Sequence, residues 1–133
     1  MRILIVEDNL TDVFFAKQAL ASAGLVADVD TVPDAASALA ALGAGHYDLV
    51  LVDVRLPGKS GIELIDDIRS NPHFGTQVVI VLSSSADESD VDKAYLARAN
   101  AYIQKPIGLI PLVAMFQKLG GFWADCAVLP PRR

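Results

Sequence analysis

The chain has few of the residues that oxidising export, zinc binding or binding to nucleic acid would require. Its 133 residues include one cysteine, Cys126, which cannot form an internal disulfide or a cysteine zinc site. Lysine and arginine number 11 against 16 aspartate and glutamate residues, and the net charge of -5 opposes sequence-independent attraction to nucleic-acid phosphates. These shortages exclude a disulfide scaffold and argue against direct binding to nucleic acid.

Long hydrophobic runs are also missing, although hydrophobic residues make up 53% of the chain. The apolar residues come in short bursts, such as Ile3–Val6 and Val78–Leu82, which are too short to cross a membrane. Only Arg2 and the first burst precede Glu7 and Asp8, which is too little for the core of a signal peptide. We therefore expect a cytoplasmic protein without membrane contact, folded as one domain.

Three uninterrupted apolar runs, at 3–6, 49–52 and 78–82, are rich in β-branched residues. Runs of this kind are typical of strands that are buried on both faces, as in a parallel sheet. Weaker strand candidates lie at 26–32 and 101–103. The sequence therefore predicts five strands.

Segments with helical spacing follow each expected strand. The first and last expected helices span 10–23 and 109–119. The second has Pro33 in its first turn, and the third begins with a capping box at Ser60–Glu63. The fourth begins at Asp87–Asp90 and turns Tyr95 inward. Phe14 and Phe15 are expected to be packing and boundary residues of the first helix. Five alternations of strand and helix predict an α/β fold, with one doubly wound, five-stranded parallel sheet covered by helices on both faces.

In such a sheet, the residues that follow the carboxyl ends of the strands share one crevice. Here they are three carboxylates, a hydroxyl and an ammonium: Glu7, Asp8, Asp53, Ser83 and Lys105. Singly, each has an ordinary explanation as a helix cap, a turn residue, a polar loop or a surface amine. Together, three carboxylates in one crevice repel each other unless a cation lies among them. Their oxygen ligands favour Mg²⁺ over zinc.

A bound divalent cation would allow one carboxylate to attack an electrophilic phosphorus and form an acyl phosphate. Ser83 and Lys105 would then supply a hydrogen bond and a positive charge to the transferred group. Phosphoryl transfer needs little beyond positioning and charge neutralisation, so this short set of residues is sufficient.

Separated motifs at 3–9, 53–61, 81–84 and 101–106 resemble, in order and at matching intervals, the receiver domain of two-component response regulators. The resemblance covers nearly the whole chain. It implies a flavodoxin-like fold with strand order 2-1-3-4-5. Because Gly120 and Gly121 are expected to break the last helix, we expect a receiver domain over 1–121 and a C-terminal tail over 122–133.

The resemblance also implies the roles of the crevice residues. Asp53 would accept a phosphoryl group from a phosphohistidine of a sensor histidine kinase. Asp8, Asp53 and the main-chain carbonyl oxygen of Arg55 would bind Mg²⁺, and Glu7 would act through a water molecule.

Three further residues would respond to the phosphoryl group, according to the same resemblance. Ser83 would move to it, Lys105 would contact it, and Tyr102 would be the aromatic switch that turns inward on activation. The resemblance further implies a cis peptide bond between Lys105 and Pro106.

A narrower resemblance, at 89–95, 100–102 and Phe122–Trp123, is to the stand-alone regulators that partner bacterial phytochromes. It implies a bacteriophytochrome as the kinase, a downstream protein as the target, and no effector domain. The two aromatic residues at 122 and 123 are expected at an interface, either in a homodimer or with the kinase.

Two other functions stay open on the residues alone. One is an Mg²⁺-dependent phosphatase that forms an aspartyl phosphate from small molecules. Such enzymes often have a second aspartate two residues after the nucleophile, whereas this chain has Arg55, which favours a signalling domain over an enzyme. The other is a flavin-binding or structural α/β module, which would leave the acidic crevice unexplained.

Overall fold

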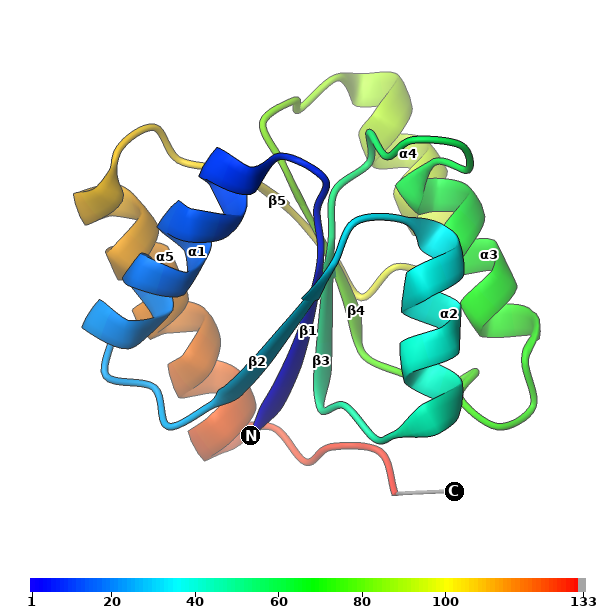
Figure 1. Cartoon of the computed structure of the whole chain (residues 1–133), viewed down its shortest axis with the longest axis horizontal. Coiled ribbons are helices and arrows are strands. Elements are labelled where there is room, and N and C mark those ends of the chain that lie inside the picture. The colour runs from blue at the N-terminus through cyan, green and yellow to red at the C-terminus, as the bar shows by residue number, and fades with distance from the viewer. Residues whose placement is uncertain (132–133) are drawn as a thin grey trace.

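A computed structural model describes residues 1–131 and shows one sheet between two layers of helices (Figure 1). The strands are β1 Arg2–Val6, β2 Asp28–Val32, β3 Leu49–Val52, β4 Val79–Ser83 and β5 Ala101–Gln104. All neighbouring strands pair in parallel, in the order β2-β1-β3-β4-β5. The fold class and the strand order predicted above are confirmed.

The three central strands are the uninterrupted apolar runs, and they form the middle of the core. Nearly every side chain of β1, β3 and β4 is buried, whereas β2 and β5 lie at the two edges and are half-exposed. Main-chain hydrogen bonds continue past the strand ends, from Asp53 N to Val6 O at 3.1 Å and from Lys105 N to Ser83 O at 2.7 Å. These bonds hold the carboxyl ends of the strands level with one another.

The helices divide into two layers, each with its own apolar core (Figure 1). They are α1 Leu10–Ser22, α2 Ala35–Ala44, α3 Gly61–Ser70, α4 Glu88–Leu96, α5 Leu109–Gly120 and the wider π-helix η1 Gly121–Cys126. The α1 and α5 helices cover one face of the sheet, and α2, α3 and α4 cover the other. No helix in 1–131 is long and apolar enough to cross a membrane.

Side-chain caps lie at the starts of α1, α2 and α3, and those of α2 and α3 test two of the predictions. The predicted capping box is confirmed, because Ser60 Oγ accepts from Glu63 N and the Glu63 carboxylate accepts from Ser60 N, both at 3.2 Å. The prediction that Pro33 lies inside the first turn of α2 is wrong. Asp34 is the cap and accepts a hydrogen bond from Ser37 N at 2.8 Å, which leaves Pro33 before the helix.

The prediction that Gly120 and Gly121 break the last helix is wrong. Both have right-handed helical dihedral angles, and α5 continues directly into η1. A Cβ atom at Gly120 would lie 2.1 Å from a methyl carbon of Leu25, so the glycine permits close packing of α5 against the α1–β2 loop. The tail that follows passes beneath the amino ends of the strands (Figure 1), where Leu129 packs against the α1/α5 core.

Three aromatic residues of the helices are exposed, and for Tyr95, which was predicted to turn inward, the prediction is wrong. Phe14 and Phe15 lie outside the stripe of α1 that packs on the sheet, and their rings meet edge to face at 5.7 Å. Tyr95 is half-exposed on α4, whose only buried residue is Ala94. The small alanine brings α4 close to the sheet and leaves the larger tyrosine at the helix edge.

Candidate phosphoacceptor and metal site

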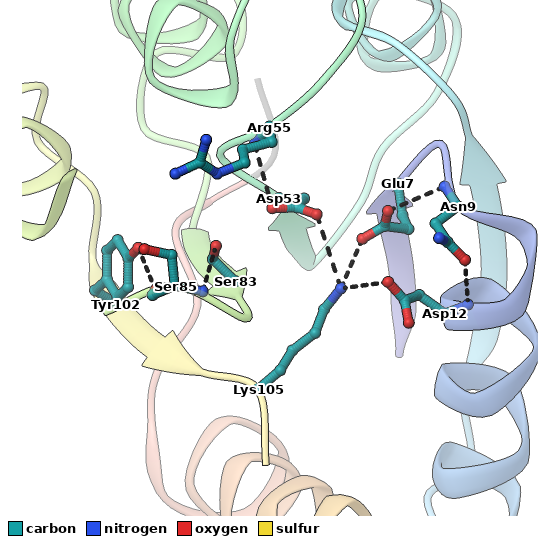
Figure 2. Close-up of polar contacts among 9 residues, drawn as sticks. All are labelled: Glu7, Asn9, Asp12, Asp53, Arg55, Ser83, Ser85, Tyr102 and Lys105. Carbon is teal, nitrogen blue, oxygen red and sulfur yellow. Dashed lines mark hydrogen bonds and ion pairs between the residues drawn. The ribbon is translucent and has the colours of Figure 1, made fainter. Parts of the chain in front are cut away.

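The ammonium of Lys105 lies at the centre of an acidic cluster at the carboxyl ends of the strands (Figure 2). Its Nζ atom is 2.7 Å from Glu7 Oε2, 3.4 Å from Asp12 Oδ2 and 3.8 Å from Asp53 Oδ2. Glu7 follows β1, Asp53 follows β3 and Lys105 follows β5, so parallel pairing alone brings these three together.

Glu7 is the buried carboxylate of the cluster. Its Oε1 atom accepts a hydrogen bond from Asn9 N at 3.0 Å. Burial raises the pKa of the Glu7 carboxyl, and the neighbouring Asp53 raises it further, while Lys105 and the Asn9 amide act in the opposite direction. The cluster is therefore short of positive charge.

Lys105 stays protonated in this setting. Burial by itself would lower the pKa of its ammonium, but the hydrogen bond to Glu7 and the charges of Asp53 and Asp12 hold that pKa above its usual value. One permanent positive charge thus faces three carboxylates.

Asp53 is positioned by main-chain bonds on both sides. Its amide donates to Val6 O, and its Oδ1 atom accepts a hydrogen bond from Arg55 N at 3.2 Å. The carboxylate is mostly buried, and while the Arg55 amide fixes Oδ1, Oδ2 points toward Lys105 (Figure 2).

Asp12 belongs to the cluster but was not among the predicted site residues. It lies in the first turn of α1, whose cap is Asn9, and the Asn9 side chain accepts from Asp12 N at 3.1 Å. The sequence signal that could have found it is the acidic residue one helical turn after Asp8. Asp8 itself lies on the exposed loop between β1 and α1.

The donor chemistry of this end of the sheet fits a hard divalent cation. A small cavity of about 20 Å³ lies beside Glu7, Asp12, Asp53 and Lys105, but most of its lining is apolar, so the fit to a cation depends on the carboxylates themselves and not on this cavity. Within 1–131, however, no three acidic or imidazole side chains already surround a single point. Mg²⁺ requires only one or two carboxylates and keeps several waters, so an open set of carboxylates suits it better than a closed cage.

Ser83 and Tyr102 lie on the other side of Asp53 from Lys105 (Figure 2). Ser83 is fully buried at the end of β4, and its Oγ atom accepts from Ser85 N at 3.3 Å. The Tyr102 hydroxyl donates to Ser85 O at 2.7 Å, and burial raises its pKa. Both side chains therefore hold the same residue of the β4–α4 loop.

The predicted cis peptide bond between Lys105 and Pro106 is wrong, because no cis bond is present in the described part of the chain. The trans isomer is favoured intrinsically even before proline, by about 0.5–1 kcal/mol.

Comparison with known proteins agrees with this geometry. The response regulator receiver domain family matches residues 3–117. Response regulator Rcp1 of Synechocystis sp. is 32% identical, over 96% of this chain and 92% of its own length.

Two solved structures are similar along almost the whole chain. The phosphorylated cyanobacterial phytochrome response regulator RcpA is 35% identical, covers 98% of both chains and has a TM-score of 0.90. The Mn²⁺-bound form of Rcp1 is 30% identical, covers 98% of this chain and 99% of its own, and has a TM-score of 0.86. The sequence motifs, the sheet topology and these relatives agree, and the chain belongs to the response regulator receiver domain family.

Proposed function

We propose that this receiver domain accepts a phosphoryl group on Asp53 from the phosphohistidine of a sensor histidine kinase. The observation that carries the proposal is the position of Asp53 at the end of the central strand β3, with its free oxygen 3.8 Å from Lys105 and with buried Glu7 beside it. The same arrangement supports the assignment of Mg²⁺ as the cofactor.

The transfer would use groups that already surround Asp53. The Oδ2 atom would attack the phosphorus, forming a P–O bond while the P–N bond breaks and its electron pair stays on the imidazole nitrogen. The Arg55 amide holds the other carboxylate oxygen and so orients the attack. The Lys105 ammonium would contact the transferred phosphoryl oxygens.

Asp8, Asp53, the Arg55 main-chain carbonyl oxygen and, through water, Glu7 would hold Mg²⁺. Its charge would offset that of the phosphoryl oxygens and of the carboxylates. Lys105 can satisfy only part of that need, since Glu7 and Asp12 already share its ammonium.

The response to phosphorylation would run through the β4–α4 loop. If the Ser83 side chain turns so that its hydroxyl donates to the phosphoryl group, the Oγ atom moves away from Ser85 N, from which it now accepts. The Tyr102 hydroxyl is bound to the carbonyl oxygen of the same Ser85, so a shift of this residue frees the ring to turn. Tyr102 is thus proposed as the switch.

The similarity to RcpA and Rcp1 supports a bacterial phytochrome as the kinase partner, in the cytoplasm, with a further protein as the target. We also propose a homodimer that involves Phe122, which is 54% exposed, beside the half-buried Trp123. Sedimentation should show a dimer whose dissociation constant rises in Phe122→Ala. A monomeric wild type would contradict this part of the proposal.

Stoichiometry separates the proposed function from that of a small-molecule phosphatase. The relatives are signalling regulators, which disfavours the phosphatase. With a phosphorylated histidine kinase and Mg²⁺, the chain should take up about one phosphoryl group and then stop until that group hydrolyses. Asp48→Asn, at the opposite end of β3, is the matched control and should accept as much. Repeated turnover of small phosphoesters, without transfer from phosphohistidine, would contradict the proposal.

A further inference from the structure

Arg55 connects the loop after β3 to α4 through an ion pair. Its Nη2 atom is 3.8 Å from Asp90 Oδ2, and the side chains are 74% and 19% exposed. This separation exceeds the length of a hydrogen bond, so the contact depends on charge rather than on fixed geometry. The guanidinium is therefore free to take another partner.

The same residue lies next to the proposed phosphoacceptor. The Arg55 amide is bonded to Asp53 Oδ1, and its side chain extends over the side of Asp53 that faces Ser83 and Tyr102 (Figure 2). The charges of Asp90 and Asp53 both raise the pKa of the Tyr102 hydroxyl, and the charge of Arg55 lowers it. All three charges thus act on one ring, from a small region beside α4.

A phosphoryl group on Asp53 would be a stronger partner than Asp90. It carries nearly two negative charges and several acceptor oxygens that a guanidinium can contact in pairs. Asp90 lies in the first turn of α4, where the helix dipole stabilises a carboxylate that has lost its partner. A move of Arg55 from Asp90 to the phosphoryl group is therefore favourable for the arginine and costs little at Asp90.

The α4 helix is suited to respond to the loss of this contact. Its only buried residue is Ala94, and its N-cap residue Asp87 makes no side-chain capping bond. A charge contact near its amino end is consequently a larger share of what holds it than the same contact would be on α3, which has four buried residues and a capping box.

We propose that Arg55 exchanges partners on phosphorylation, from Asp90 on α4 to the phosphoryl group on Asp53, and that this exchange loosens the amino end of α4. The inference rests on the proposed function of Asp53. It assigns to one arginine both the reading of the phosphoryl group and the release of a helix.

The exchange makes Asp90 a competitor of the phosphoryl group, and this competition can be measured with beryllium fluoride and Mg²⁺ as the phosphoryl mimic. Removing the competitor in Asp90→Asn should tighten binding of the mimic by about two- to fivefold, the effect of one exposed ion pair. In Arg55→Ala, the mimic should bind more weakly. In Arg55→Ala/Asp90→Asn, the gain from the second substitution should disappear.

Glu88→Gln is the matched control, because it removes the same charge from the same first turn of α4. Glu88→Gln should change the affinity for the mimic less than Asp90→Asn does. Its effect should be the same in the wild type and in Arg55→Ala. A second readout is amide hydrogen exchange in α4 without the mimic. Arg55→Ala and Asp90→Asn should each speed exchange at the amino end of α4, and the double variant should be no faster than either.

The outcomes distinguish this inference from the proposed function. If the mimic binds the wild type but Asp90→Asn has the same effect with and without Arg55, the exchange is wrong and the phosphoacceptor assignment stands. If the wild type does not bind the mimic, or binds it equally in Asp53→Asn, both proposals are overturned. The inference is supported if the effects of Arg55→Ala and Asp90→Asn do not add in the double variant, both for the affinity for the mimic and for amide hydrogen exchange in α4.

Discussion

The amino and carboxyl ends of the sheet both contain clustered acids, but the acids are partnered differently. Toward the amino end, Asp30, the middle residue of β2, accepts from the Tyr47 hydroxyl at 2.6 Å and from the Arg2 guanidinium at 3.2 Å. Asp48 accepts from the Arg2 main-chain amide at 2.8 Å, and His46 lies 3.4 Å from its other oxygen. The Tyr47 hydroxyl holds the pKa of Asp30 below its usual range.

At the carboxyl end, by contrast, Glu7, Asp12 and Asp53 share the ammonium of Lys105. The pKa of Glu7 is raised instead of lowered, chiefly by burial. Two acids with several donors thus form a structural cluster, whereas three acids that share one ammonium form a site that can take a cation and a phosphoryl group.

The larger cavity of the protein does not lie at the proposed phosphoacceptor site. A cavity of about 580 Å³ lies at the amino end, lined by the loops before β3 and β4 and by residues 129–131, against about 20 Å³ beside Asp53. The chemistry of phosphoryl transfer requires placed charges and little volume, because the proposed donor is a phosphohistidine that a partner protein would bring to the surface.

The largest expected difference between the two ends is in metal binding. Asp8→Asn should lower the affinity for Mg²⁺ by about 100-fold or more, because loss of a residue that only supports a ligand already costs about 10- to 100-fold. Asp48→Asn should leave it unchanged, because Asp48 lies at the amino end of β3. Titration calorimetry measures both. Equal loss in the two variants, or none in Asp8→Asn, would contradict the ligand assignment.

A smaller difference, of opposite sign at the two ends, is expected in stability without metal. Asp53→Asn removes a charge from the crowded end and should raise the free energy of unfolding by about 1 kcal/mol. Tyr47→Phe deletes the donor to Asp30 and should lower the free energy of unfolding. Urea unfolding in a chelator tests the pair. Changes of the same sign would show that the two clusters do not differ in kind.

The smallest expected effect is in the pH dependence of stability. Because the pKa of Glu7 is raised in the folded protein, folding takes up protons between the unfolded value near 4.5 and the higher folded value. Without metal, the wild type should therefore lose stability relative to Glu7→Gln as the pH rises through this window. Saturating Mg²⁺ should reverse the trend, since it requires the charged carboxylate. Parallel curves for the two proteins in a chelator would contradict the role of Glu7.

Most of this fold could be predicted from the sequence, because buried parallel strands have uninterrupted apolar runs and their carboxyl ends must meet. From this rule alone, Glu7, Asp53 and Lys105 could be predicted to lie close together.

The contributions of helices could not be predicted in the same way. Asp12 and Asp90 reach the site from α1 and α4, and the positions of these helices depend on packing that the pattern does not encode. Gly120 failed as a helix stop because its close packing against Leu25 outweighs its local preference.

Locating the phosphoryl group after reaction with a small acyl phosphate tests the central claim most directly. Intact mass and peptide mapping should find one group, on Asp53, that depends on Mg²⁺ and is prevented by a chelator. Asp53→Asn should remain unlabelled, and Asp48→Asn at the other end of the same strand should be labelled as fully as the wild type. Labelling that persists in Asp53→Asn, or that is indifferent to Mg²⁺, would contradict the account.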